Sequence, residues 1–525
     1  MTLLNLSLFA PDLVATAEPV NLEPLILVSV LLAVVVIHLA SRLMGEISVR
    51  MGFPSVLGEL IGGVLVGSSV LGLLIFQGGT SGEELLPLAE SSQLIQFLER
   101  TTGVSGEAVA EVFSAQSEII NILSELGVII LLFEIGLESD LGELIRVGPQ
   151  AAVVASIGVV VPFVGGTLGL IYLFDIPSIP AIFAGAALTA TSIGITARVL
   201  AEMRQLSSPE GQVIIGAAVL DDVLGIIILA VVAGLARTGE VVISDIAWIA
   251  FSAVAFLVGS IVVGRLLSPY LVSLIDNLKT RGNPLIPGLI IAFVLAYVAQ
   301  VIQLEAILGA FAAGLILGET QKRGEFEEQV RPLSDLFTPI FFVCVGAKTN
   351  LAVLDPRIPA NQEGLIIAAF LIVVAMLGKL AAGLGAFGKP GINKLAIGVG
   401  MIPRGEVGLV FAGVGAASGV LSDSLGVSII VMVIVTTFVA PLWLRGVFSR
   451  PEHSQESDQE STVAEGIPED ADPATDLTSQ QLALEEGNAE MPSLANLQQE
   501  VVTQDAAASG RSTKGTSVLE PADEG

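Results

Sequence analysis

Long apolar runs recur along most of the chain and constrain its fold more than any other feature. A helix needs about 20 consecutive apolar residues to cross the hydrocarbon core of a bilayer. Roughly thirteen runs of this kind lie before residue 450. Only 14% of the 525 residues are charged, whereas soluble domains have about a quarter. We therefore expect an all-α polytopic membrane protein with about 13 transmembrane helices.

The expected spans are 24–44, 54–76, 117–137, 150–174, 178–203, 209–236, 244–271, 284–303, 304–320, 332–351, 363–387, 393–420 and 424–448. Positive charge is distributed unevenly between the two sets of loops that these spans define. With the N-terminus outside, fifteen basic residues lie on the cytoplasmic side and four on the other, which are Arg100, Arg237, Lys348 and Arg357. Because basic loops are retained in the cytoplasm, the bias predicts an N-terminus outside and a C-terminus in the cytoplasm.

Three segments lie outside the expected bundle. Residues 1–23 form an extracytoplasmic N-terminus, and residues 77–116 form an acidic extracytoplasmic loop. Leucines and isoleucines in this loop predict a short surface helix that caps the bundle edge, with a binding module as the alternative. The tail 451–525 has seventeen acidic residues against Arg511 and Lys514, which accounts for about half of the net charge of −29. We expect an acidic, disordered cytoplasmic tail after a membrane domain at 24–450.

Two adjacent acidic residues, Asp221 and Asp222, lie in the middle of the apolar run 214–236. A single carboxylate near the bilayer centre costs about 2.5–3.5 kcal/mol on insertion scales. Such residues mark ion or proton pathways by default, so this pair predicts ion or proton transport. The alternative is a structural cluster of buried charges.

Other ionisable residues within the spans are few. Lys379 is the only lysine well inside a span, so it is the expected partner of one aspartate. Asp221 and Asp222 project about 100° apart on a helix, so they cannot face the same partner. Glu59 and Glu125 line the cytoplasmic entrance or lie near a helix end, and the second interpretation is favoured.

Two spans contain residues that break helices. Residues 184–200 contain Thr189, Thr191, Ser192, Gly194 and Thr196, which weaken the helix and supply hydroxyl oxygens. Non-helical backbone at membrane depth is tolerated only where it is buried in protein or lines a cavity.

The second broken span is 397–411, where Pro403 interrupts the helix and Gly405 follows. The two breaks lie seven spans apart and so have opposite orientation, as an inverted repeat of six spans requires. Half-helices carry opposing partial charges where they meet, which Arg404 and Glu406 can offset. Close helix packing is the alternative explanation of the small residues.

Several segments together resemble the monovalent cation:proton antiporter superfamily, specifically its second branch of bacterial sodium/proton antiporters. The resemblance covers about residues 24–448, and a cyanobacterial member is the expected closer match. The segments that carry it are LGELIGGVLVG (57–67), LSELGVIILLFEIGLESDL (123–141), TATSIGITARVL (189–200), AAVLDDVLGIIILA (217–230), LGAFAAGLILGE (308–319), FFVCVGAKTNL (341–351) and GMIPRGEVGLV (400–410).

The resemblance implies a role for each matching residue. Asp222 is similar to the site that binds cation and proton in turn, and Asp221 to the partner of the buried lysine, here Lys379. Thr191 and Ser192 match the hydroxyl residues where the broken helices cross. Glu406 matches the acidic residue of the second broken helix. The family fold implies a core bundle with two crossed broken helices, a dimerisation bundle and a homodimer.

A secondary antiporter that exchanges sodium, lithium or potassium for protons is therefore expected, and not an enzyme. The aspartate pair resembles that of electrogenic members. We expect contacts with membrane lipid, no cofactor and no nucleic acid, in a bacterial plasma membrane or alternatively a thylakoid membrane. The rival hypotheses are a potassium/proton antiporter or potassium efflux system, an ion channel and an intramembrane aspartyl protease. The protease is disfavoured because its two aspartates must face each other from separate helices.

Overall fold

Helices account for nearly all of the regular structure in the computed structural model, which describes residues 22–76, 85–102, 106–238, 243–277, 284–387 and 391–448. The described residues form one compact unit. The tail 451–525, for which we predicted disorder, lies outside the described residues. Most of the N-terminal segment 1–23 lies outside them as well. Within the described ranges there is no β-strand, which confirms the all-α prediction.

The helices are α1 (Glu23–Arg50), α2 (Ser55–Val66), α3 (Leu85–Ser91), α4 (Gln93–Thr102), α5 (Glu107–Glu138), α6 (Leu141–Phe174), α7 (Ser178–Ala187), α8 (Ile193–Glu202), α9 (Pro209–Thr238), α10 (Ile243–Asn277), α11 (Leu285–Val301), α12 (Ala306–Gly318), α13 (Arg323–Ala347), η3 (Leu351–Leu354), α14 (Pro359–Ala382), η4 (Gly383–Gly385), α15 (Lys394–Gly400), α16 (Glu406–Ala417) and α17 (Asp423–Phe448). Eight segments in the described part are long and apolar enough to cross a membrane by length and composition. Shorter apolar helices, including α2, α7, α11 and α12, lie in other expected spans. The number of crossings stays a prediction.

Two expected boundaries were wrong. The span expected at 54–76 is helical only to Val66, because the chain turns at Gly67 against α13. A Cβ at Gly67 would lie 2.6 Å from the backbone of Ala347. The loop expected at 77–116 contains short helices where one was predicted, α3 and α4, but it ends early because α5 begins at Glu107. Leu94 and other apolar residues of α4 are buried in a cluster shared with α1 and α5.

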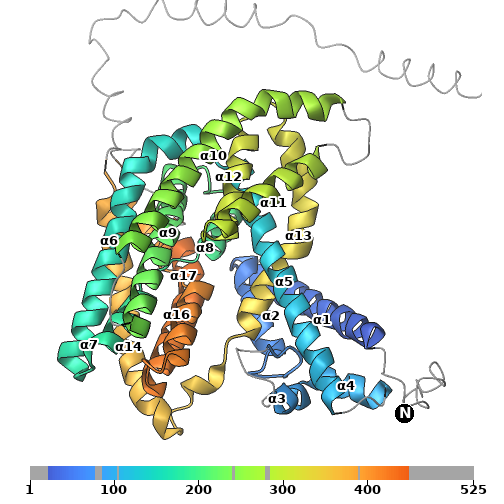
Figure 1. Ribbon diagram of the computed structural model, residues 1–525, viewed down its shortest axis with the longest axis vertical. Helices are drawn as coiled ribbons and strands as arrows, with labels where there is room; N and C mark the ends of the chain where they lie inside the picture. Colours follow the sequence, from blue (N-terminus) through green and yellow to red (C-terminus); the bar gives the residue numbers. More distant parts are fainter. Residues whose placement is uncertain are drawn as a thin grey trace, which may run out of the picture. The chain divides into compact units, whose positions relative to one another are not determined.

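The long helices form two bundles (Figure 1). We call α1, α2, α5, α11, α12 and α13 the six-helix bundle, and α6–α9 with α14–α17 the core bundle. Packing partners repeat between the two halves of the chain: α1 packs on α2 as α11 packs on α12. In the core bundle, α6 packs on α9 as α14 packs on α17. This repetition agrees with a repeat in which α10 is the connecting helix, and the inverted orientation of the two halves stays a prediction.

Glycines set the closest helix crossings of the six-helix bundle. A Cβ at Gly63 of α2 or Gly346 of α13 would lie 2.2 or 2.1 Å from a carbonyl oxygen of the facing helix. At the equivalent crossing of α5 and α12, the distances at Gly136 and Gly314 are 2.4 and 2.3 Å. Small residues let helix backbones approach closely in membranes. The two crossings are thus the same packing arrangement, and each joins a helix of one repeat to a helix of the other.

Candidate functional site

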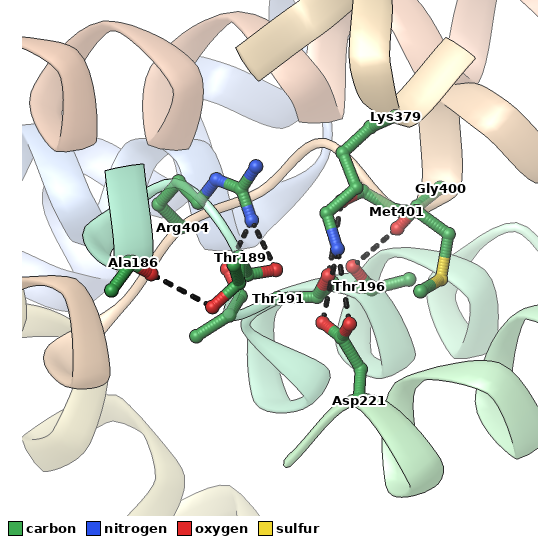
Figure 2. Close-up of polar contacts among 10 residues, drawn as sticks. Ala186, Thr189, Thr191, Thr196, Asp221, Lys379, Gly400, Met401 and Arg404 are labelled. Carbon is green, nitrogen blue, oxygen red and sulfur yellow. Dashed lines mark hydrogen bonds and ion pairs between the residues drawn. The ribbon is translucent and has the colours of Figure 1, made fainter. Parts of the chain in front are cut away.

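The two broken helices of the core bundle meet at their breaks. Residues 188–192 separate α7 from α8, and residues 401–405 separate α15 from α16. The Ser192 amide donates a hydrogen bond of 2.8 Å to the Pro403 carbonyl. The Thr191 hydroxyl donates one of 3.1 Å to the Met401 carbonyl, which Figure 2 also shows. Backbone groups that the breaks leave without helical partners therefore bond across the crossing, as buried backbone polar groups must.

Hydroxyl side chains complete this connection. Thr196 in α8 donates a hydrogen bond of 2.9 Å to the carbonyl of Gly400, the last residue of α15 (Figure 2). Thr189 donates one of 2.7 Å to the Ala186 carbonyl near the C-terminus of α7. Ser192 is 5% exposed and lies where a Cβ on Gly405 would be placed. The hydroxyl residues predicted at the crossing therefore lie there.

Arg404 occupies the second break and reaches the first. Its side chain is buried, and its guanidinium Nη1 donates hydrogen bonds to the carbonyls of Thr189, at 2.9 Å, and Ala190 (Figure 2). Both carbonyls directly follow the C-terminus of α7, where a helix dipole places partial negative charge. Thr437 in α17 donates its hydroxyl to the Arg404 carbonyl. The arginine thus offsets the dipole of the broken helix that faces it.

An ion pair joins α9 to α14 beside this crossing. The Lys379 ammonium lies 3.0 and 3.2 Å from the two carboxylate oxygens of Asp221 (Figure 2). Both side chains are completely buried. A buried charge is tolerated where it is paired and hydrogen-bonded. The structure therefore brings together the lysine and the first aspartate of the doublet.

Asp222 follows directly on α9 and is 4% exposed. It shares a helix face with Gly225, because residues three apart on a helix are neighbours. A Cβ on Gly225 would lie 3.8 Å from the Cβ of Ala190 in the first break. The face of α9 that carries Asp222 is therefore next to the crossing. Lys379 also interacts electrostatically with Asp222, although its hydrogen bonds go to Asp221.

The remaining acidic candidates are spread over other places. Glu406 begins α16, but its side chain lies outside the described part of the structure. Glu59 of α2 and Glu134 of α5 are buried in the six-helix bundle, and Glu125 of α5 is exposed. None of these three is hydrogen-bonded or ion-paired to Asp221 or Lys379 among the described residues. Among the residues that the structure describes, no three His, Cys, Asp or Glu side chains converge on one point.

This site can hold one exchangeable positive charge. Asp221 is balanced by Lys379, and Arg404 is held by backbone carbonyls. Asp222 adds a second carboxylate beside them in a place that excludes most water. A carboxylate there can take a cation or a proton, and occupancy by one disfavours the other.

Sequence reasoning missed two polar residues of α8, Arg198 and Glu202. The Arg198 side chain is mostly buried, and its Nε lies 3.3 Å from a carboxylate oxygen of Glu202. The available signal was their spacing of four residues within an expected span, which places them on one helix face.

Comparison with known proteins identifies the class. A model of the transmembrane sodium/hydrogen exchanger family matches residues 28–450. The chain therefore belongs to this family. This confirms the predicted family, and it confirms an antiporter, not an enzyme. The assignment to the second branch stays a prediction.

Individual relatives agree with this class. The high-affinity Na⁺/H⁺ antiporter NhaS3 of Synechocystis is 64% identical over 439 residues, which cover 83% of this chain and 94% of that protein. The Na⁺/H⁺-K⁺ antiporter GerN of Bacillus cereus is 32% identical, with coverage of 81% and 97%. The solved structure of the sodium proton antiporter MjNhaP1 from Methanocaldococcus jannaschii superposes with a TM-score of 0.52 at 16% identity. The match covers 81% of this chain and 97% of the MjNhaP1 chain, and it shows a likeness of fold.

Proposed function

We propose that this protein exchanges sodium for protons across a bacterial membrane, with Asp222 as the group that binds either ion in turn. The observation that carries the proposal is the buried Asp221–Lys379 ion pair, held beside Asp222 where two broken helices cross. The 64% identity to a high-affinity Na⁺/H⁺ antiporter supports sodium as the cation.

Each site residue receives one role. Asp222 binds the cation or the proton, and the oxygens of Thr191 and Ser192 replace part of the hydration shell of the cation. Lys379 neutralises Asp221 while the lysine carries its proton, as in the ion pair of this structure. Arg404 and Glu406 offset the partial charges of the half-helices.

The exchange is proposed to be electrogenic, with more than one proton moved per sodium. Lys379 supports this, because a buried amine can release and take up a proton together with Asp222. In an electrogenic exchanger, a membrane potential alone drives ion movement. Asp221→Asn in proteoliposomes is then expected to give exchange that responds less to an imposed potential than wild-type exchange.

Alternating access is proposed to arise from movement of the core bundle against the six-helix bundle. We further propose a homodimer formed through the six-helix bundle. An exposed apolar stripe on α1 supports it, formed by Leu27, Leu31, Val35, Leu39 and Leu43 at helical spacing. The charge bias supports an N-terminus outside the cell and a C-terminus in the cytoplasm.

The test is dissipation of a pH gradient in proteoliposomes on addition of sodium. Wild type is expected to collapse the gradient, and Asp222→Asn is expected to be silent. Glu125→Gln is the matched control, since it removes an exposed acidic residue of a span that makes no ion pair with Lys379. Exchange by Asp222→Asn at the wild-type rate would overturn the site assignment.

A second candidate cation is potassium, because the relative GerN is named a Na⁺/H⁺-K⁺ antiporter. The same proteoliposome assay tests potassium as the exchanged cation when potassium replaces sodium. An equal response to both cations would favour a nonselective antiporter.

A further inference from the structure

The inner half of the first broken helix is fastened to the other bundle by charged groups. Glu202 lies at the end of α8 in the core bundle, and Ser55 begins α2 in the six-helix bundle. The Ser55 amide donates a hydrogen bond of 2.8 Å to one carboxylate oxygen of Glu202. The Ser55 hydroxyl donates one of 2.5 Å to the other oxygen. Both oxygens of the carboxylate are thus used between the bundles.

This contact satisfies the N-terminus of α2. Pro54 precedes the helix and provides no side-chain cap. The first amides of a helix have no partner within it, and the helix dipole places partial positive charge there. The carboxylate of Glu202 supplies from the core bundle the charged acceptor that the local sequence lacks.

Arg198 adds a second link one helical turn earlier. Its Nε lies 3.3 Å from the same Glu202 carboxylate. It also interacts electrostatically with Glu59 of α2, Glu134 of α5 and Asp335 of α13. Glu59 and Glu134 are 6% and 8% exposed, so they depend on nearby positive charge. A cation of the core bundle therefore lies among carboxylates of the six-helix bundle.

The equivalent region of the second repeat lacks these charges. The helix that corresponds to α8 is α16, in which Phe411 and Gly415 take the places of Arg198 and Glu202 when the first helical residues are aligned. When Gly136 of α5 is aligned with Gly346 of α13, the residue that corresponds to Glu134 is Cys344. In the structure, α8 packs on α2 and α5, whereas α16 packs on α7, α9 and α17 of its own bundle. The charged contacts that Arg198 and Glu202 make with the six-helix bundle therefore lie at one end of the molecule.

We infer that Arg198 and Glu202 are positioning residues of the exchange cycle, which form a latch between the bundles and close the inner route to Asp222 in this conformation. The inner end is the one that the charge bias assigns to the cytoplasm. The inference rests on the proposed function, in which the core bundle moves against the six-helix bundle. The latch then has to release each time the site opens inward.

Reversible crosslinking tests the latch. The engineered pair is Ser55→Cys with Glu202→Cys, in a Cys344→Ala background that removes the single natural cysteine. A short bifunctional thiol reagent is added to proteoliposomes, and sodium-driven proton exchange is measured before and after reduction. The control pair is Ser69→Cys with Thr349→Cys, which joins two turns within the six-helix bundle. There the Ser69 hydroxyl donates a hydrogen bond of 2.6 Å to the Thr349 carbonyl.

Crosslinking the latch pair is expected to slow exchange about tenfold or more relative to the same protein before treatment, and reduction restores the rate. The control pair keeps its rate when crosslinked. The latch is refuted if its crosslinked pair exchanges at the untreated rate, if the pair does not crosslink, or if the control pair is stopped equally. Sodium-driven proton exchange in vesicles with wild-type protein tests the proposed function separately. If wild type exchanges no cation, the proposed function fails and the latch with it.

Discussion

Removal of the Lys379 ammonium takes away the ion-pair partner of Asp221. In Lys379→Met, the apolar stem is replaced at similar volume, while the contacts of 3.0 and 3.2 Å to Asp221 are lost. Breaking a buried ion pair on one side costs about 3–5 kcal/mol, because the remaining charge has no compensation. Both side chains are completely buried, so solvent screening does not reduce this figure. Lys379→Met is therefore expected to be strongly destabilised.

The double variant Asp221→Asn with Lys379→Met is the decisive comparison. It removes both charges, and replacement of a buried pair by neutral groups is often neutral or even stabilising. We expect its apparent Tm, measured by thermal unfolding in detergent, to lie above that of Lys379→Met alone. If the two substitutions lower the Tm additively, the pair is not coupled and the reasoning is wrong.

Two further predictions concern packing and the crossing. Gly63→Ala places a methyl group 2.2 Å from the carbonyl oxygen of Val343, so unfolding in detergent should show a loss of about 1–3 kcal/mol or more. Gly259→Ala in α10 meets no neighbouring heavy atom within 4 Å and should instead gain about 0.5–1 kcal/mol; a loss equal to that of Gly63→Ala would refute the packing argument. Arg404→Gln removes a charged donor to the Thr189 carbonyl, so the same measurement should show a loss of about 1.5–3 kcal/mol. An unchanged Tm would show that Arg404 does not hold the crossing.

The breaks in the two core helices could be predicted from the sequence because residue types cause them. Threonines, Ser192 and Gly194 weaken the first helix, and Pro403 interrupts the second. Thr189, Thr191 and Ser192 lie in the first break and Pro403 lies in the second, whereas Gly194 lies inside α8. Lys379 could be assigned to the doublet because no other lysine lies well inside a span. A lone charge at membrane depth has few possible partners.

Contacts with backbone groups could not be predicted in the same way. Arg404 bonds to two carbonyls, and carbonyls carry no sequence signal. The bond between Glu202 and Ser55 joins residues 147 positions apart and depends on how the bundles pack. The early end of α2 follows from close contact of Gly67 with α13, which apolar composition does not reveal.

The central claim is that cation and proton compete for Asp222. Proton release on addition of sodium to purified protein in weakly buffered detergent solution tests this most directly, because it needs no transport cycle. Wild type and Glu125→Gln are expected to release protons as sodium binds, and Asp222→Asn is expected to release none. Release from Asp222→Asn equal to that from wild type would contradict the claim and move the exchange site to another carboxylate.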